Sequence, residues 1–380
     1  MFKIKAMKKI TVSGAGLVGK AIILELCKKY EVTAVDCDKD KLKFFENIQS
    51  VNTVQADISD AKSIQKIIQN VDLVIGAVPG FLGFEFLKNV IKCRKNIVDI
   101  SFFPEDPFQL DKLAKEHNVT VIVDCGVAPG MSNLILGHHN QFMKVESFEC
   151  LVGGLPFERN LPYQYKAPFS PADIIEEYIR PARIMQNGEI ITKPALSDAE
   201  YVDIEPIGTL EAFNTDGLRT LLKTMKIPNM KEKTLRYPGH IEYIRFLRET
   251  GFFDKEKIQI ENMKIRPIDI TSKLLFSKWK LEENEPEFTV MEITIKGIEQ
   301  EKQKQYKYHL FDKFDDKTKI SSMARTTGYT CTAIADLVLE GKYNQKGICP
   351  PEFIGMKPEC FKEVILYLKN RNVNYSVESL

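Results

Sequence analysis

Three glycines in the segment Gly14-Ala15-Gly16-Leu17-Val18-Gly19 have the spacing that binds the pyrophosphate of a dinucleotide. Gly14 permits a tight turn, Gly16 lets the backbone approach a phosphate, and Gly19 lets a helix pack closely on a strand. The helix that begins here adds N–H groups and a partial positive charge. Asp36, about 20 residues on, can accept hydrogen bonds from ribose hydroxyls and repel a 2′-phosphate, although Lys39 lies nearby. We therefore predict an NAD site held by Gly14, Ala15, Gly16, Leu17, Val18, Gly19 and Asp36.

Further candidate residues come directly after other short apolar runs: Asp57-Ile58, Ala77-Val78-Pro79 and Ser101. In a parallel sheet the carboxyl ends of all strands lie at one edge, and ligands bind there. We expect the loop Ala77–Gly80, with Ala77, Val78 and Pro79, under the nicotinamide ribose; alternatively it is a plain turn. Asp57 either flanks the adenine or caps the next helix.

The elements that must position these residues alternate regularly along the first third of the chain. Strands are predicted at 10–12, 32–35, 51–55, 72–76, 96–100 and 119–123, with helices at 18–26, 40–48, 60–69, 84–93 and 107–117. Six strands that alternate with helices predict an α/β fold with a Rossmann-type doubly wound parallel sheet.

The pattern changes from Glu146, where apolar and polar residues alternate as in a half-exposed strand. A Pro-rich connection follows at 153–171, and a polar loop at 299–305 precedes a return strand at 306–311. We therefore expect a second α+β domain, built on an antiparallel sheet, over residues 145–320. Residues 1–144 form the dinucleotide-binding domain, and helices in 321–380 complete it.

The composition bounds the class of protein. The 380 residues are 44% hydrophobic and 28% charged, with a formal net charge of +1. This length indicates two domains. Without a long basic run, nucleic acid and anionic membranes are not expected as partners, and no apolar stretch reaches the ~20 residues that span a bilayer. No signal peptide is evident at the N-terminus, so we expect a cytoplasmic protein.

Cysteine and histidine spacing indicates neither disulfides nor metal. The eight cysteines include no C-x-x-C pair and are expected to be reduced thiols. The five histidines lack the spacing of a metal motif, so we predict no metal site.

Several stretches resemble one known family, in order and over most of the chain. They resemble the lysine 6-dehydrogenases, a branch of the saccharopine dehydrogenase family. The stretches are AVPGFLGF (77–84), DISFFPEDP (99–107), DCGVAPGMSN (124–133), VGGLP (152–156), EYIRPARI (177–184), EAFNTDGLRTLL (211–222), EKTLRYPGH (232–240) and MARTTG (323–328).

The resemblance implies NAD-dependent oxidative deamination of the ε-amino group of L-lysine. The product would be the 6-semialdehyde, which cyclises to piperideine-6-carboxylate, with release of ammonia. A homodimer formed largely through the second domain is also implied. Many saccharopine dehydrogenases carry an aspartate before the Pro-Gly that corresponds to Pro129-Gly130, whereas this chain has Ala128. Ala128 favours the lysine branch, and that aspartate's catalytic role cannot be transferred here.

Such a substrate needs a cation for its α-carboxylate, ideally a bidentate arginine. Arg236 is the preferred anchor, because Tyr237-Pro238-Gly239 makes a rigid turn beside it. It is alternatively a packing arginine, and Arg219, Arg180 and Arg183 are the other candidates. Asp216 either holds the α-ammonium or caps the helix that starts at Gly217. Tyr165 is a further candidate for contact with the substrate.

The reaction also needs a group that handles the proton of the amine. Hydride leaves the ε-carbon readily only when the ε-amine is neutral, and lysine has a pKa of about 10.4. Asp124, at the end of the last parallel strand, is the preferred base, unless it only caps the turn of Gly126–Gly130. Lys166 and His240 are the other candidates. Lys166 is alternatively a solvated side chain, and His240 a packed ring.

Two other functions stay open. A saccharopine or carboxy-polyamine dehydrogenase would act on a secondary amine and would need a second arginine for the additional carboxylate. A catalytically silent nucleotide-binding protein would instead sense the redox state.

Overall fold

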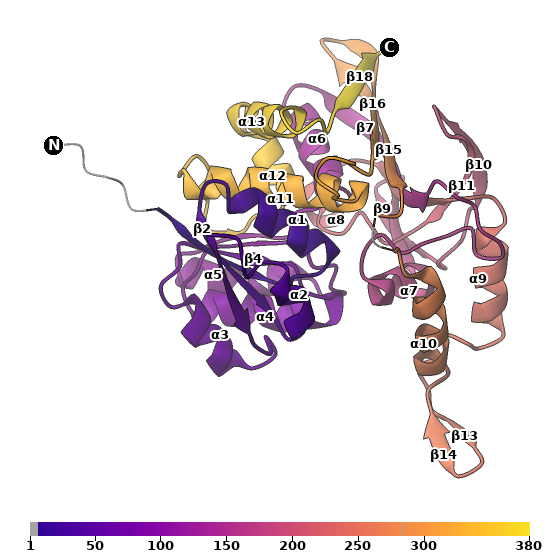
Figure 1. Cartoon of the computed structure of the whole chain (residues 1–380). Coiled ribbons are helices and arrows are strands. Elements are labelled where there is room, and N and C mark those ends of the chain that lie inside the picture. Colours follow the sequence, from indigo (N-terminus) through magenta and orange to yellow (C-terminus); the bar gives the residue numbers. More distant parts are fainter. Residues whose placement is uncertain (1–6, 283) are drawn as a thin grey trace. The chain divides into compact units, whose positions relative to one another are not determined.

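The computed structural model describes residues 7–282 and 284–380, which form two compact units (Figure 1). Unit 1 comprises Met1–Phe142 and Ala324–Val373, and unit 2 comprises Met143–Met323 and Asn374–Leu380. The chain therefore leaves unit 1 once, returns to it, and ends in unit 2.

Unit 1 is built on a parallel sheet of seven strands. Their spatial order is β17-β6-β5-β4-β1-β2-β3. Between β1 and β4 the order of winding reverses, and this switch point is where open α/β sheets bind their ligands. The strands are β1 (Lys9–Ser13), β2 (Glu31–Asp36), β3 (Val51–Gln55), β4 (Leu73–Gly76), β5 (Ile97–Asp99), β6 (Thr120–Ile122) and β17 (Gly347–Ile348).

The strands of this sheet are apolar because helices cover both faces. All residues of β4, β5 and β6 are buried, as expected for parallel strands. The helices are α1 (Leu17–Leu26), α2 (Lys39–Lys43), α3 (Ala61–Ile68), α4 (Gly80–Lys92), η1 (Pro107–Leu110), α5 (Asp111–Glu116), α6 (Met131–His139), α11 (Ser322–Leu339), α12 (Pro351–Gly355) and α13 (Pro358–Lys369).

Unit 2 is built on a nine-stranded mixed sheet that is mostly antiparallel. Its main order is β10-β11-β12-β7-β15-β16-β18, and β8 pairs with both β12 and β9. β7 and β12 run parallel, while the other pairs are antiparallel. The strands are β7 (Lys144–Pro156), β8 (Ala182–Gln186), β9 (Glu189–Lys193), β10 (Glu200–Ile204), β11 (Gly208–Asn214), β12 (Asn229–Arg236), β15 (Glu287–Glu299), β16 (Lys302–Lys313) and β18 (Tyr375–Ser379).

Helices and one separate hairpin complete unit 2. The helices are α7 (Pro171–Ile179), α8 (Leu221–Thr224), α9 (His240–Glu249) and α10 (Pro267–Trp279). The hairpin of β13 (Ile258–Ile260) and β14 (Met263–Ile265) extends beyond one end of α10 (Figure 1).

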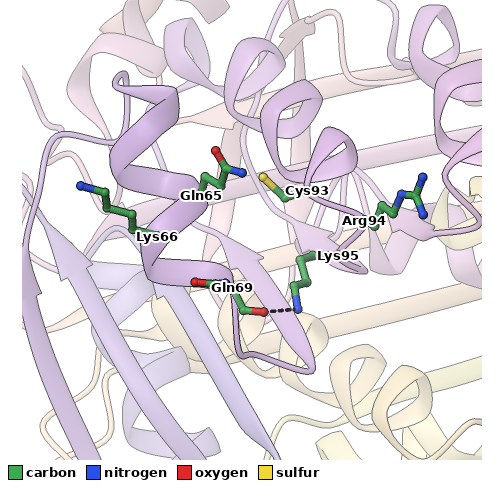
Figure 2. Close-up of a pocket in the computed structure, with 6 residues that line it drawn as sticks. All are labelled: Gln65, Lys66, Gln69, Cys93, Arg94 and Lys95. Carbon is green, nitrogen blue, oxygen red and sulfur yellow. Dashed lines mark hydrogen bonds between the residues drawn. The ribbon is translucent and has the colours of Figure 1, made fainter.

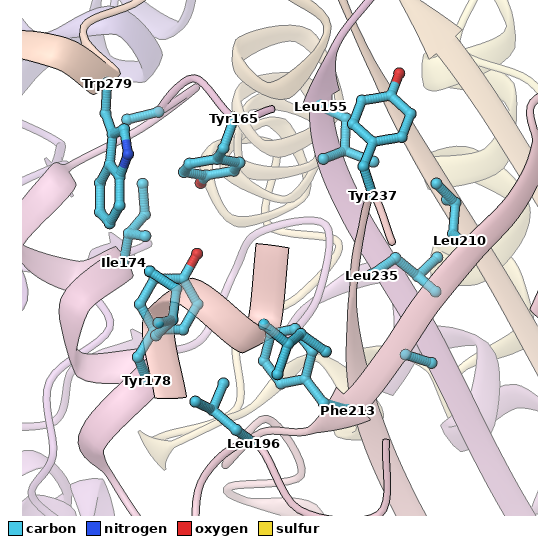
Figure 3. Close-up of a cluster of buried hydrophobic side chains, with 14 of the residues drawn as sticks. Leu155, Tyr165, Ile174, Tyr178, Leu196, Leu210, Phe213, Leu235, Tyr237 and Trp279 are labelled. Carbon is cyan, nitrogen blue, oxygen red and sulfur yellow. The ribbon is translucent and has the colours of Figure 1, made fainter. Parts of the chain in front are cut away.

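Aromatic side chains dominate part of the core of unit 2. Figure 3 shows Trp279, Tyr165 and Tyr178 close to one another, with Phe213 beyond Tyr178. Trp279 meets both tyrosine rings edge-on, with centroids 5.5 and 6.1 Å apart. These contacts hold α7, α10 and the segment around Tyr165 together. The side chains of Trp279, Tyr165 and Tyr178 form what we call the aromatic wall.

Strand β7 is longer than the sequence predicts. It includes Gly153 and Gly154, which we expected to begin the Pro-rich connection. A Cβ on Gly153 would lie 2.7 Å from the Leu235 carbonyl oxygen, and one on Gly154 2.6 Å from the Met323 methyl carbon. These glycines therefore mark close approach of neighbours within a strand, not a break in it.

The predicted polar loop at 299–305 is mostly strand. β15 and β16 pair from Phe288↔Lys313 to Glu299↔Lys302, and the turn between them consists of Gln300 and Glu301. Both residues have positive φ angles, 48° and 64°, as in a two-residue type I′ turn. The polar residues at 302–305 lie on the strand itself.

Across residues 7–282 and 284–380, no helix combines the length and apolar character needed to cross a bilayer.

Candidate active site

The glycine loop of unit 1 lies at the switch point of the parallel sheet. Gly14 has φ +101°, and a Cβ there would lie 2.1 Å from the Ala77 carbonyl oxygen. A Cβ on Gly19 would lie 1.9 Å from the Gly14 carbonyl oxygen. A Cβ on Gly16, in contrast, would have nothing within 4 Å. Gly14 and Gly19 thus allow close backbone contacts that a Cβ would prevent. Gly16 instead borders open space on the outer side of the loop.

The N-terminus of α1 faces this open side with its backbone amides. Gly16 is the N-cap residue, and among the described residues no side chain caps the helix. The first turn also carries no acidic residue. An anion such as a pyrophosphate fits both the open space at Gly16 and the positive end of the helix, where Leu17 and Val18 begin the first turn.

Asp36 ties the glycine loop to the end of β2. Its Oδ2 accepts a hydrogen bond from the Ala15 N–H at 2.8 Å, and its Oδ1 accepts one from the Asp38 N–H at 2.9 Å. The side chain is 7% exposed, and Lys41 Nζ lies 3.7 Å from Oδ1. The cation closest to this carboxylate is thus Lys41, whereas the sequence drew attention to Lys39.

The other predicted cofactor residues follow their strands as expected for a parallel sheet. The Ala77 N–H donates to the Ser13 carbonyl at 2.8 Å, and Val78 and Pro79 lead into α4. Ser101 is buried and binds Asp99 through both its N–H and its hydroxyl, at 2.9 and 3.0 Å.

Asp57 and Ile58 behave differently from each other. Asp57 is exposed and accepts a hydrogen bond from the Ser59 N–H at 2.8 Å, which lowers its pKa. The cap of α3 is Asp60, not Asp57. Ile58 packs against the core of unit 1.

Asp124 lies at the same edge, two residues beyond the end of β6. It is 2% exposed and has φ +54°, an uncommon backbone conformation for a residue other than glycine. The next residue, Cys125, donates its N–H to the Asp99 carbonyl at 3.0 Å. Burial raises the pKa of the Cys125 thiol, and the nearby Cys331, Asp99 and Asp124 raise it further. Two carboxylates and two thiols therefore gather beyond β5 and β6.

Arg236, in unit 2, is held by the aromatic wall. It is 2% exposed and ends β12. Its Nε donates to the Tyr178 hydroxyl at 3.1 Å, and its Nη1 donates to the Leu235 carbonyl at 2.9 Å. Its guanidinium carbon lies 4.5 Å from the centroid of the Tyr165 ring, a cation–π contact. Glu177 Oε2 accepts from Nη2 at 2.8 Å and balances the charge.

His240 fixes the hydroxyl that Arg236 binds. Its Nδ1 lies 2.8 Å from the Tyr163 carbonyl oxygen, which can only accept, so Nδ1 carries the proton. Nε2 then accepts from the Tyr178 hydroxyl at 2.9 Å. Burial, aided by the charge of Arg236, lowers the pKa of His240 to about 3. The ring is neutral, with both nitrogens occupied, an arrangement suited to orienting Tyr178.

Tyr165 and Lys166 point to different partners. Tyr165 is buried against Arg236 and Trp279, and burial raises its pKa well above the ordinary value. Lys166 donates to the Lys280 carbonyl at 3.1 Å and lies 3.6 Å from Glu285. The structure thus joins Tyr165 to the Arg236 cluster and Lys166 to the segment after α10.

Asp216 belongs to a second charged group in unit 2. Arg183 binds it in a bidentate way, with Nε and Nη2 each 2.8 Å from a carboxylate oxygen, and the Arg183 N–H adds a third bond at 3.1 Å. Arg219, buried with φ +44°, precedes α8 in the same segment. Burial and the charge of Arg219 lower the pKa of Arg180. Several arginines therefore converge near Asp216.

Unit 1 also has a shallow pocket that is separate from the predicted cofactor site. Figure 2 shows it between the C-terminal ends of α3 and α4, where Lys95 donates to the Gln69 carbonyl at 2.8 Å. Helices of a doubly wound fold run opposite to the strands, so these ends lie away from the edge that carries the glycine loop.

Asp99 and Glu177 lie beside the predicted site residues but were not among them. Asp99 ends a buried apolar strand, the same signal that drew attention to Asp36 and Asp124. Glu177 lies in the EYIRPARI stretch, but its contact with Arg236 joins residues 59 positions apart in two different elements, and no local pattern predicts that.

The fold and the glycine loop define a dinucleotide-binding protein with a second α+β unit. A family model described as the saccharopine dehydrogenase NADP binding domain matches residues 10–122, and one described as the saccharopine dehydrogenase C-terminal domain matches residues 126–373. The chain belongs to the saccharopine dehydrogenase family.

Curated relatives support this membership. The chain is 30% identical over 238 residues to alpha-aminoadipic semialdehyde synthase of Arabidopsis thaliana, over 58% of this chain and 22% of that protein. It is 23% identical over 312 residues to the saccharopine dehydrogenase [NADP(+), L-glutamate-forming] of Pyricularia oryzae, over 78% of this chain and 69% of that protein. The chain spans only 22% and 29% of the Arabidopsis thaliana and Mus musculus alpha-aminoadipic semialdehyde synthases.

Solved structures share the fold. Apo saccharopine dehydrogenase (L-Glu forming) from Saccharomyces cerevisiae superposes with a TM-score of 0.78 at 19% identity, covering 98% of this chain and 100% of that one. Homospermidine synthase from Legionella pneumophila, in complex with NAD, gives 0.68 at 12% identity, covering 98% and 91%.

Proposed function

We propose that the protein catalyses NAD-dependent oxidative deamination of the ε-amino group of L-lysine. Water and the oxidised cofactor are consumed, and the 6-semialdehyde, ammonia and reduced cofactor are formed. The observation that carries the proposal is the place of Asp124, a buried carboxylate two residues beyond β6 at the ligand-binding edge of the parallel sheet. Ala128 supports the lysine branch of the family.

The residues at the switch point fit a dinucleotide. Gly14–Gly19 and the N-terminus of α1 would hold its pyrophosphate, and Asp36 would bind the adenosine ribose. When bound, the cofactor supplies a hydride acceptor. We propose NAD over NADP because Asp36 is a buried carboxylate that opposes a 2′-phosphate, although Lys41 lies 3.7 Å from it.

In this proposal Asp124 handles the proton of the substrate. At pH 7, about 3.4 pH units below the pKa of the ε-amine, very little of the amine is neutral. Forming the neutral amine costs roughly 4.6 kcal/mol. Asp124 accepts the ammonium proton and later orients the water that attacks the imine. Lys166 is the alternative base. His240 remains a candidate, but the Tyr178 hydroxyl would have to stop donating to Nε2 before the neutral ring could accept a proton.

Unit 2 would bind the amino-acid end of the substrate. Arg236 is proposed as the carboxylate anchor, with Tyr165 beside it. Asp216 and Arg219 are proposed as further contacts, although Asp216 already accepts three bonds from Arg183.

A saccharopine dehydrogenase is the second candidate function. The arginines near Asp216 favour it, because a secondary amine of this class carries an additional carboxylate that needs its own cation.

We also propose a homodimer formed through unit 2. The hairpin β13–β14 supports it, because its apolar residues Ile258, Ile260 and Met263 are exposed by 47%, 42% and 59%.

A substrate and cofactor screen tests the proposed function. The kcat/KM values for L-lysine, saccharopine and carboxy-polyamines are measured with NAD and with NADP. Lysine with NAD is expected to give the highest value. A clear preference for NADP would overturn the cofactor assignment, and a preference for saccharopine would favour the second candidate.

A further inference from the structure

The ion pair of Arg236 and Glu177 differs from a structural salt bridge in how its two partners are held. Arg236 is fixed by the Tyr178 hydroxyl, by the Leu235 carbonyl and by the face of Tyr165. Glu177 meets it through a single oxygen, Oε2, at 2.8 Å. The Arg236 side chain is 2% exposed and that of Glu177 is 17% exposed. Glu177 is therefore the solvent-side and less constrained partner.

The buried carboxylate of Asp216 is held very differently. It accepts three hydrogen bonds from Arg183, two of them as a bidentate pair at 2.8 Å. A ligand ammonium at Asp216 would have to break this fork. Among the described residues, the hydrogen bond that Glu177 would exchange is the one from Arg236 Nη2, so it is the better-placed carboxylate for a cationic ligand.

We propose that Glu177 and Arg236 together bind the zwitterionic head of an α-amino acid, Glu177 taking the α-ammonium and Arg236 the α-carboxylate. The inference rests on the proposed function and deepens it, because it names the substrate class. Substrates carry both charges at the head and the reacting amine at the other end.

Charge balance is the physical reason. Arg236 and Glu177 are neutral as a pair, and a zwitterionic head is neutral too. When the head enters, Glu177 Oε2 leaves Nη2 for the ammonium and the ligand carboxylate replaces it, so one ion pair becomes two and no charge is left unbalanced. A ligand with only one of the two charges would leave a buried charge without a counter-ion, which proteins tolerate poorly.

Tyr178 and His240 are positioning residues in this arrangement. Because His240 Nε2 accepts a hydrogen bond from the Tyr178 hydroxyl, the Tyr178 oxygen presents a lone pair to Arg236 Nε. The guanidinium therefore keeps its orientation when Glu177 leaves it.

The test compares L-lysine with two analogues that each lack one charge, 6-aminohexanoate without the α-amine and cadaverine without the carboxylate. In the wild-type protein both analogues are expected to show kcat/KM at least tenfold below lysine. In Glu177→Gln, kcat/KM for lysine should fall about ten- to a hundredfold, the effect of one charge-assisted bond, while 6-aminohexanoate is unchanged or improved. Glu176→Gln, which removes the neighbouring half-buried carboxylate that pairs with Lys255 and Arg180, is the matched control and should match wild type.

A loss of equal size for lysine and 6-aminohexanoate in Glu177→Gln would overturn the proposal, since a structural role affects both alike. Calorimetric binding of L-norleucine, which keeps the head and lacks the ε-amine, separates this inference from the proposed function. Norleucine binding that needs Glu177, in a protein that oxidises no amine, would uphold the head site and refute the reaction. Turnover of lysine at the same kcat/KM as both analogues that lack one charge would uphold the reaction and refute the head site. If Glu177→Gln does not fold, wild-type binding of norleucine against hexanoate and hexylamine decides, and equal binding of all three contradicts the proposal.

Discussion

Two buried carboxyl groups lie at the C-terminal ends of β5 and β6 in unit 1. Asp99 and Asp124 are almost wholly inaccessible, and both are close enough to Cys125 to raise its pKa. A carboxylate in such surroundings binds a cation more strongly than one in water, because little solvent screens the attraction. The proposed reaction uses this setting to bind and deprotonate the ammonium group of the substrate.

Asp124→Asn should lower kcat by about a hundred- to ten-thousandfold, the usual contribution of a general base, while dinucleotide binding is kept. In the wild-type protein the rate should rise with pH above neutrality, because deprotonation of the free ε-amine, with a pKa of about 10.4, supplies the reactive form. Steady-state rates from pH 6 to 10 and a dinucleotide titration measure both effects. A folded Asp124→Asn protein with near-normal kcat would remove Asp124 from the reaction and leave Lys166 to be tested.

His240 should make the protein sensitive to acid. Its folded-state pKa of about 3 lies below the value of about 6.5 expected for an unfolded histidine, so between these pH values only the unfolded chain binds the proton. The stabilisation is complete above pH 6.5 and is lost as the pH falls towards 3. Relative to His240→Gln, the free energy of unfolding of wild type should drop by about 2 kcal/mol between pH 7 and pH 5. Denaturant titrations at several pH values measure this, and parallel curves for the two proteins would contradict the burial of a neutral ring.

At the residue scale, the sequence predicted positions better than partners. Asp36 and Asp124 were predicted because each lies at or just beyond the end of a β-strand in a regular repeat. The same reasoning could not show that Asp216 is bound by Arg183 or that Arg236 faces Glu177, because these contacts join separate elements.

The glycine loop and α1 form the element at the switch point where the pyrophosphate is proposed to bind. The three glycines have different structural roles. Single alanine substitutions can distinguish an effect on stability from an effect on dinucleotide binding. Gly14 needs its positive φ and its closeness to Ala77, whereas Gly16 borders open space.

Gly14→Ala should destabilise the protein by at least about 1–3 kcal/mol, because its Cβ would require both a strained backbone and a 2.1 Å contact with the Ala77 carbonyl oxygen. Gly16→Ala should leave stability close to wild type and weaken dinucleotide binding, because its Cβ fills the side where the pyrophosphate would lie. Thermal unfolding and dinucleotide titration of both variants provide the comparison. Equal effects of the two substitutions on stability would show that the loop is not built as described.

At the element scale, local periodicity explains why the parallel sheet was predictable and the second sheet less so. Each β-α unit of unit 1 is contiguous in sequence, so alternating apolar runs and helices suffice. In unit 2, β7 pairs in parallel with β12, and residues as far apart as Lys144 and Ile298 pair in β7 and β15. The sequence therefore predicts that the strand ends at Gly153 and Gly154, because the neighbours that pack against these glycines come from distant parts of the chain.

The hairpin β13–β14 matters at the scale of the whole molecule. The cross-strand pairs Ile258↔Ile265 and Ile260↔Met263 place four apolar residues on one face, while Gln259 and Lys264 occupy the other. A two-stranded hairpin is only marginally stable alone, and an exposed apolar face of this kind marks an interaction site. The flanking residues carry both signs of charge, such as Glu256, Lys257 and Glu261, which suits pairing with a second copy of the same surface.

Replacing both Ile260 and Met263 with glutamate should convert a dimer into a monomer, because two charges would enter the apolar face. Sedimentation equilibrium of wild type and variant measures this, with Gln259→Glu on the opposite face as the control. A wild-type protein that sediments as a monomer, or a dimer unaffected by the double substitution, would exclude the hairpin as the contact between copies.

The course of the chain through both units was only partly readable. Residues Ala324–Val373, with most of α11 and all of α12 and α13, belong to unit 1. Strand β17 has two residues, and strand β18 is mostly exposed. Their sequences therefore do not predict that they pair with β6 and β16.

The most direct test of the proposed reaction is a product balance with L-lysine and NAD. Reduced cofactor is followed by absorbance while ammonia is assayed in the same sample. Oxidative deamination of a primary amine predicts one ammonia for each reduced cofactor formed, together with the cyclised 6-semialdehyde. Reduced cofactor without ammonia, or turnover of saccharopine alone with release of an amino acid, would contradict it.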